Sequence, residues 1–233
     1  MRVILNTYIN NDELPFIEPA MQLIRPSSLA VYDMQSKADL TGNAVMDFSG
    51  SFNTQGAVLS SINDSINTKI NESDNMTLIY CWNLAARSGQ RFSSLSNFTP
   101  SAAPYSGIRL ATDTTGVTTW SAATGLASPS VTMMSNVNIL GAWTVQTLTV
   151  SNTQIRRITH GGSVTQATVS ARAKSTYPIF LNAVPSIPTG ITEGTTGTIG
   201  FFCAYNEILA DADAISSMDT IASIMATRGV AVP

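Results

Sequence analysis

Short runs of apolar, β-branched and aromatic residues recur along most of this chain, and they constrain its fold more than any other feature of the sequence. The clearest runs are Met76 to Trp82, Trp143 to Val150 and Thr198 to Tyr205. Residues of these types suit the pleated, partly buried surface of a β-strand. The first run is apolar on both faces and the third is the most apolar of all, so both are predicted to be central strands. We therefore expect the main part of the chain to be an all-β domain.

Turn residues between shorter runs predict two β-hairpins. Asp113 to Gly116 lies between two strand-like runs, and so does His160 to Gly162. Gly and Asp take the backbone conformations that tight turns require. A further short strand is expected at Gly56 to Leu59. The isoleucines at positions 62, 66 and 70 are four residues apart, which predicts one small helical turn packed on the core.

One long helix is predicted, at the C-terminal end of the chain over residues 211–228. Its apolar positions recur at three- and four-residue steps and form a single stripe. The stripe comprises Ile215, Met218, Ile221, Ala222 and Met225. Asp211 is expected to cap the start of the helix, and Gly229 is expected to take the left-handed conformation that ends it. Such a stripe needs a sheet to cover.

Residues 1–30 differ from the rest and are predicted to form an extended N-terminal arm. Prolines at positions 15, 19 and 26 exclude a long helix and a central strand in this segment. The arm would lie along a partner or along its own domain, which then spans residues 31–233. The alternative is an edge strand and a loop of that same domain, and the sequence does not decide between the two.

Composition excludes several classes of function. Charged residues make up 12% of the chain, the net charge is −3, and Ser, Thr, Asn, Gly and Ala take the share that charged residues leave. A nucleic-acid-binding protein needs a basic stripe to neutralise phosphates, so no nucleic-acid partner is expected. No apolar run reaches the ~20 residues that span a bilayer, and the N-terminal residues lack the apolar segment of a signal peptide. We expect no membrane insertion and no secretion signal.

Four segments, in this order, resemble a laminin-G-like, concanavalin-A-like jelly roll. They are Asp47 to Gly50, Thr77 to Trp82, His160 to Gly162 and Ile199 to Leu209. The resemblance covers roughly residues 30–230 and implies a two-sheet antiparallel jelly-roll sandwich that ends in a helix. Compact, weakly charged versions of this domain without a signal peptide are similar to bacteriophage virion proteins.

No catalytic constellation is found. Glu72-Ser73-Asp74 lacks the third acid of the strand that glycosidases of this fold class use, and it is interpreted as a solvated turn. Two carboxylates alone, as in an inverting glycosidase, are left open. His160 is the only histidine and is interpreted as an exposed turn residue, because no Gly-x-Ser-x-Gly elbow accompanies it.

No metal or cofactor is expected either. One histidine and two separated cysteines, Cys81 and Cys203, do not make a zinc site, and both cysteines are predicted to be buried free thiols. Calcium would suit Asp, Asn and backbone oxygens, with Asp113 as a contributor, but no Asp-x-Asp-x-Asp run supports such a site.

A long loop at residues 83–106, predicted to lack regular structure, is the candidate ligand-binding region. Aromatic faces with nearby hydrogen-bond donors can bind sugars, because sugar C–H faces pack on rings and hydroxyls need partners. The candidate binding residues are Arg87, Arg91, Phe92, Tyr105 and Trp120. The alternative is that the aromatic members belong to the core.

Three functional hypotheses follow. The first is a non-enzymatic phage virion protein of the tail, tail tip or fibre, assembled in the host cytoplasm and able to touch a surface glycan. Its arm would dock on other virion proteins, and the chain would form a homo-oligomer. The second is a capsid decoration or head-fibre protein, and the third is a stand-alone carbohydrate-binding module.

The helix stripe generates the first prediction. Ile221→Asp is expected to detach the C-terminal helix, because each buried Ile or Met of the stripe contributes roughly 1.5–3 kcal/mol. The midpoint of a thermal melt followed by circular dichroism should fall. An unchanged midpoint would show that the stripe does not pack on a sheet.

Overall fold

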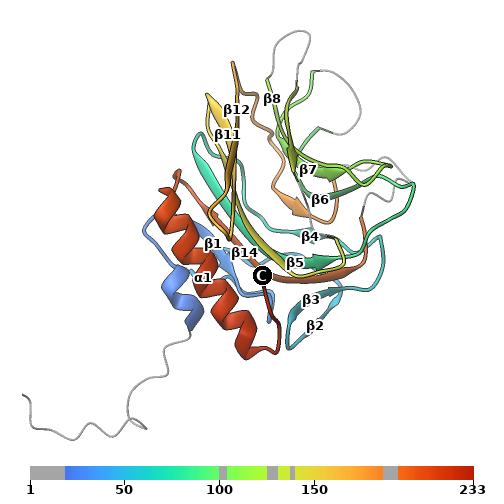
Figure 1. Ribbon diagram of the computed structural model, residues 1–233, viewed down its shortest axis with the longest axis vertical. Helices are drawn as coiled ribbons and strands as arrows, with labels where there is room; N and C mark the ends of the chain where they lie inside the picture. The colour runs from blue at the N-terminus through green and yellow to red at the C-terminus, as the bar shows by residue number, and fades with distance from the viewer. Residues whose placement is uncertain (1–18, 100–103, 125–130, 137–139, 186–193) are drawn as a thin grey trace, which may run out of the picture.

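The computed structural model describes residues 19–99, 104–124, 131–136, 140–185 and 194–233. Two antiparallel β-sheets lie face to face, and one α-helix lies on the outer face of the larger sheet (Figure 1). The predicted fold class, a two-sheet antiparallel β-sandwich with one C-terminal helix, is confirmed. Among the described residues, no helix is long and apolar enough to cross a membrane.

The larger sheet has eight strands in the order β12-β11-β10-β5-β14-β3-β2, with β1 also paired to β14. Its strands are β1 (Ser28–Tyr32), β2 (Ser51–Asn53), β3 (Gly56–Leu59), β5 (Met76–Leu84), β10 (Thr144–Val150), β11 (Gln154–Thr159), β12 (Val164–Thr168) and β14 (Gly197–Tyr205). The two most apolar strands, β5 and β14, pair with each other at the centre, as the sequence predicts.

The smaller sheet has six strands in the order β4-β13-β6-β7-β8-β9. Its strands are β4 (Ile66–Asn67), β6 (Phe92–Ser96), β7 (Ile108–Thr112), β8 (Thr118–Ala123), β9 (Val131–Asn136) and β13 (Phe180–Leu181). Both predicted hairpins are present: Asp113 to Gly116 joins β7 to β8, and His160 to Gly162 joins β11 to β12.

Two expectations for the loops are wrong. Strand β6 lies inside the segment 83–106 that was expected to lack regular structure, and its serines gave no apolar alternation to reveal it. The isoleucines at positions 62, 66 and 70 do not form a helical turn, because Ile66 belongs to the two-residue strand β4 and pairs with Leu181. Edge pairing with β13 therefore overrides the four-residue spacing.

Large side chains from both sheets fill the space between them. Tyr80 and Trp82 of β5 stack with ring centroids 3.7 Å apart, and they belong to the same buried cluster as Trp120 and Leu95 of the smaller sheet. Side chains alternate between the two faces of a strand. The face of the smaller sheet that points away from this core can therefore carry polar residues.

Helix α1 (Asp211–Thr227) and the short 3₁₀ helix η2 (Pro19–Leu23) cover the other face of the larger sheet (Figure 1). Met218 and Ile221 pack there on Phe201 and on both cysteine side chains. Cys81 and Cys203 are free and buried, as predicted, and burial raises the pKa of each thiol to about 12.

The helix ends differ in one respect from the expectation. Gly229 takes the left-handed conformation, with φ of 77°, as predicted. Asp211 does not cap the helix: Ala210 is the N-cap residue, and the Asp211 carboxylate instead pairs with the Arg156 guanidinium at 2.7 Å. The ion pair ties the start of α1 to strand β11 of the sheet beneath it.

The described part of the predicted arm, residues 19–30, packs on the domain. Ala20 and Leu23 are buried against α1, and the Tyr205 hydroxyl donates a hydrogen bond to the Leu23 carbonyl at 2.9 Å. Strand β1 begins at Ser28 and pairs with β14. This corresponds to the alternative interpretation, a strand and loop of the same domain. Residues 1–18 lie outside the described residues, and their role as an arm stays a prediction.

An ion pair with both side chains fully buried joins two of the connections that pass between the sheets, β4–β5 and β12–β13. The Arg172 guanidinium contacts Glu72 Oε1 at 2.6 and 2.8 Å, while Glu72 Oε2 accepts hydrogen bonds from Asn97 Nδ2 and the Ser175 amide. The expectation that Glu72-Ser73-Asp74 is a solvated turn is therefore wrong for Glu72. Asp74, in contrast, is exposed and pairs with Lys174.

Breaking this buried pair should destabilise the whole domain. Arg172→Met is expected to lower the free energy of unfolding by about 3–5 kcal/mol, because it leaves a buried carboxylate without its counter-charge. Urea titration followed by tryptophan fluorescence measures the change. Lys174→Met removes the neighbouring exposed pair and serves as a control with little effect, since exposed pairs contribute little. Equal midpoints for the two variants would contradict this role of Arg172.

Candidate ligand-binding site

Three residues on neighbouring backbone segments form a row on the outer face of the smaller sheet. Phe180 of β13 is opposite Asn67 of β4, and Asn67 is bridged in turn to Asp47 by two backbone hydrogen bonds of 2.9 and 3.0 Å. Side chains directly opposite each other share one face of a sheet. The adjacent residues Ile66 and Leu181 are buried in the core, so this row faces outward.

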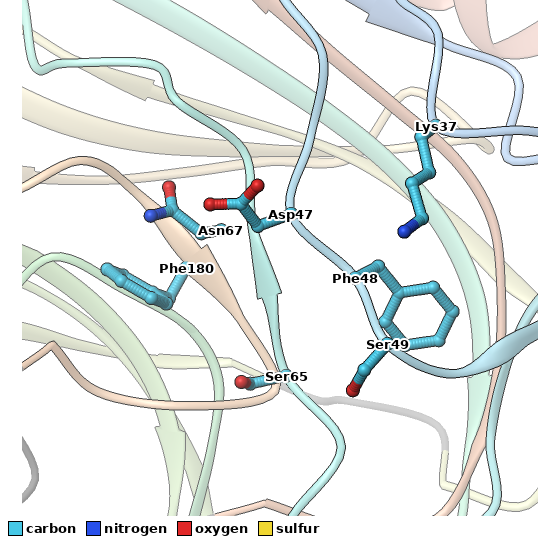
Figure 2. Close-up of a pocket in the computed structure, with 7 residues that line it drawn as sticks. All are labelled: Lys37, Asp47, Phe48, Ser49, Ser65, Asn67 and Phe180. Carbon is cyan, nitrogen blue, oxygen red and sulfur yellow. The ribbon is translucent and has the colours of Figure 1, made fainter.

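The row forms one wall of an open cavity of about 480 Å³ (Figure 2). The residues that line it are Lys37, Asp47, Phe48, Ser49, Ser65, Asn67 and Phe180. A cavity of this volume lies within the range of small-molecule sites, which is about 300–1,000 Å³. We call it the Phe180 pocket.

The polar groups of the Phe180 pocket include both donors and acceptors. Asp47 forms an ion pair with Lys69, and the Asn67 side-chain oxygen accepts the Lys69 amide at 2.9 Å, which leaves the Asn67 NH₂ group for a ligand. The Lys37 ammonium is exposed and forms no ion pair or hydrogen bond within the described residues. Figure 2 shows Asp47 and Asn67 side by side, with Lys37 extending toward the Phe48 ring.

This arrangement suits the binding of a neutral, hydroxyl-rich ligand. The Phe180 ring is partly exposed and offers an apolar face beside the Asn67 amide and the Asp47 carboxylate. Aromatic faces take the C–H surface of such a ligand, and a few polar groups orient its hydroxyls. Asp47 is the one acid among the described lining residues, whereas glycoside hydrolysis uses two.

The described residues contain no group of three or more His, Cys, Asp or Glu side chains able to hold a metal ion. His160 lies far along the chain from the pocket residues, at the β11–β12 turn. Its Nδ1 lies 3.0 Å from the Pro233 carbonyl oxygen, and its Nε2 lies 2.9 Å from Asp219 Oδ1. These contacts fix the turn on the end of the chain and on α1.

Two of the five predicted binding residues belong to the core. Phe92 and Trp120 have 0% exposed surface, and Trp120 Nε1 donates to the Thr149 carbonyl at 3.4 Å. A ligand arriving from solvent does not reach either ring, so the prediction that they bind one is wrong. Their alternation with the serines and threonines of β6 and β8 turns them toward the opposite sheet.

The other three predicted residues lie at the surface but do not form one site. Arg87 donates to the Gly194 carbonyl at 2.7 Å. Arg91 is exposed and lines a second cavity, of about 240 Å³, together with Arg109. Tyr105 stacks on Phe98 with centroids 5.2 Å apart. The Phe180 pocket contains none of the five.

Sequence reasoning missed Lys37, Asn67 and Phe180. The two short strands that carry Asn67 and Phe180 have two residues each, too few for any periodicity. The one available signal was Asp47 to Gly50, which the sequence identifies as a turn and which supplies three of the lining residues.

No protein-family model matches this chain, and no curated protein matches its sequence. Several solved structures match its fold. The botulinum neurotoxin serotype D ligand-binding domain in complex with N-acetylneuraminic acid has a TM-score of 0.63 and 18% identity, with 86% of this chain and 52% of that chain covered. The binding domain of Paraclostridial Mosquitocidal Protein 1 has a TM-score of 0.61 and 12% identity, with 84% and 52% covered.

A mutant of Trypanosoma rangeli sialidase displaying trans-sialidase activity also matches, with a TM-score of 0.62, 12% identity, and 84% of this chain and 33% of that chain covered. This chain thus spans about half the length of the toxin binding domains. At such identities the likeness shows the fold alone, a jelly-roll β-sandwich. The finer resemblance to laminin-G-like domains of phage proteins stays a prediction.

Proposed function

We propose that this domain is a non-enzymatic glycan-binding module and that the Phe180 pocket is its binding site. The observation that carries the proposal is the partly exposed Phe180 ring, set in register beside Asn67 and Asp47 on a solvent-facing sheet surface. A ring and two hydrogen-bonding side chains on one face can hold a sugar through its C–H surface and its hydroxyls together.

The fold comparison supports a binding role. Structures with the same sandwich include domains described as ligand-binding or receptor-binding, and one of them was solved with N-acetylneuraminic acid. A sialidase shares the fold as well, so the fold by itself does not separate binding from catalysis.

The acids of this chain favour binding over hydrolysis. Both carboxylate oxygens of Glu72 accept hydrogen bonds, from Arg172, Asn97 and the Ser175 amide. Neither oxygen is therefore available to protonate a leaving group. Asp47 stands alone in the pocket and is paired with Lys69. A general acid paired with a second carboxylate is what glycoside hydrolysis uses.

A single open pocket of this kind binds sugars weakly, at around millimolar dissociation constants, about −4 kcal/mol. Display in many copies raises avidity a hundredfold or more. The phage virion that the sequence resemblance implies is such a setting: virion proteins would be the partners, and residues 1–18 of the predicted arm would be the docking segment. The chain would be a homo-oligomer on the tail or, alternatively, on the capsid.

Substitution of the aromatic ring tests the site. Phe180→Ala is expected to weaken glycan binding at least tenfold, about 1.4 kcal/mol, on an array probed with multivalently coupled protein. Tyr177→Ala removes an exposed aromatic ring outside the pocket and is the matched control. Equal binding by both variants, with circular dichroism showing both folded, would refute the assignment. Release of reducing sugar from a bound glycan would refute the non-enzymatic role.

A further inference from the structure

A second cavity lies on the same outer face of the smaller sheet, over strands β7, β8 and β9. It is lined by Arg91, Arg109, Ala111, Thr112, Asp113, Thr119 and Met133, and its volume is about 240 Å³. We call it the arginine pocket. Arg109 is opposite Ser96 of β6, which in turn is opposite Phe180 of β13. Two strand spacings therefore separate Arg109 from Phe180, roughly 10 Å between Cα atoms.

Arg109 is held in place before any ligand arrives. Its guanidinium carbon lies 4.7 Å from the centroid of the Phe98 ring. The Phe98 ring also stacks with the ring of Tyr105. Cation–π contact of this kind orients the planar guanidinium. The Arg109 side chain is partly buried, so its charge is less screened than that of a fully exposed arginine.

Arg91 supplies the second cation. It immediately precedes the buried Phe92, which is opposite Thr112 at the end of β7, so its backbone is fixed at the rim of the pocket. The Arg91 side chain is exposed and forms no hydrogen bond or ion pair within the described residues. It is therefore available to a ligand.

Asp113 is the one acid among the described lining residues, and it is committed to its own turn. Its Oδ1 accepts hydrogen bonds from the Thr115 amide and hydroxyl at 2.8 and 2.7 Å and from the Val117 amide at 3.0 Å. The hydrogen bonds from Thr115 and Val117 lower the pKa of Asp113, so it stays ionised near neutral pH. Two cations against one anion leave the pocket with a positive formal charge, in a protein whose net charge is −3.

We propose that the arginine pocket binds the anionic group of an acidic sugar, a carboxylate or a sulfate ester, as a subsite separate from the Phe180 pocket. Guanidinium groups bind carboxylates and other oxyanions through paired hydrogen bonds, and Met133 and the Ala111 methyl offer an apolar floor beside them. That the anion belongs to a sugar rests on the proposed function, whereas recognition of the anion rests on the two arginines alone. One acidic oligosaccharide could occupy both subsites, with a neutral unit on Phe180.

The test is a titration of the full chain with glucuronic acid, its methyl ester and glucose 6-sulfate, followed by NMR. The acid is expected to bind at least tenfold more tightly than the neutral ester, and its affinity should fall as salt concentration rises. Arg91→Gln and Arg109→Lys should each weaken acid binding at least tenfold while neutral-sugar binding at Phe180 is unchanged. Lys174→Gln removes an exposed cation elsewhere and is the control.

The outcomes separate the two proposals. Equal affinity for acid and ester, or acid binding unchanged in Arg91→Gln, would overturn the arginine subsite even where neutral sugars still bind in a Phe180-dependent way. Arginine-dependent binding of the acid without any neutral-sugar binding would keep the subsite and refute the Phe180 site. Binding of the sulfate ester is expected to depend on Arg91 and Arg109 in the same way, and its affinity relative to that of the acid shows which oxyanion the pocket prefers.

Discussion

The buried Glu72–Arg172 pair holds together the part of the fold on which the candidate site depends. Glu72 lies between β4 of the smaller sheet and β5 of the larger one, and Arg172 lies between β12 of the larger sheet and β13 of the smaller one. Two crossings between the sheets are thus fastened to each other by one desolvated contact. Because these crossings deliver β4 and β13, they also place Asn67 beside Phe180.

The two faces of the smaller sheet explain how one fold combines a rigid core with a binding surface. Leu95, Leu110 and Trp120 are in register and point into the core. Ser96, Arg109 and Ser121 form the next row on the opposite face, where Arg109 is partly buried and both serines are fully buried. On the larger sheet, α1 and η2 pack over much of the outer face. The Phe180 pocket and the arginine pocket lie on the other side of the sandwich, on the two sides of β6.

The fold class is predictable from the sequence, but only some of the residues that line the two pockets are. β5, β14 and α1 are long enough for periodicity to reveal them. Within the predicted helix stripe, Met218, Ile221 and Met225 are buried, whereas Ile215 and Ala222 are only partly buried. β4 and β13 exist only through pairing with segments distant in sequence, so nothing local announces Asn67 or Phe180. Trp120 is a candidate ligand-binding residue in the sequence but a core residue in the structure, because residue type alone does not say which face of a strand is covered. The sequence singles out Arg91 within the segment 83–106, whereas Arg109 comes to line the same cavity only through the pairing of β6 with β7.

The most direct measurement is a map of amide chemical-shift changes in the folded domain as a glycan identified by array screening is added. The changes are expected to centre on Asp47, Asn67 and Phe180 and to extend across β6 to Arg109 when the glycan is acidic. Changes confined to α1 and η2, or to the β11–β12 turn around His160, would contradict the assignment of ligand binding to the outer face of the smaller sheet.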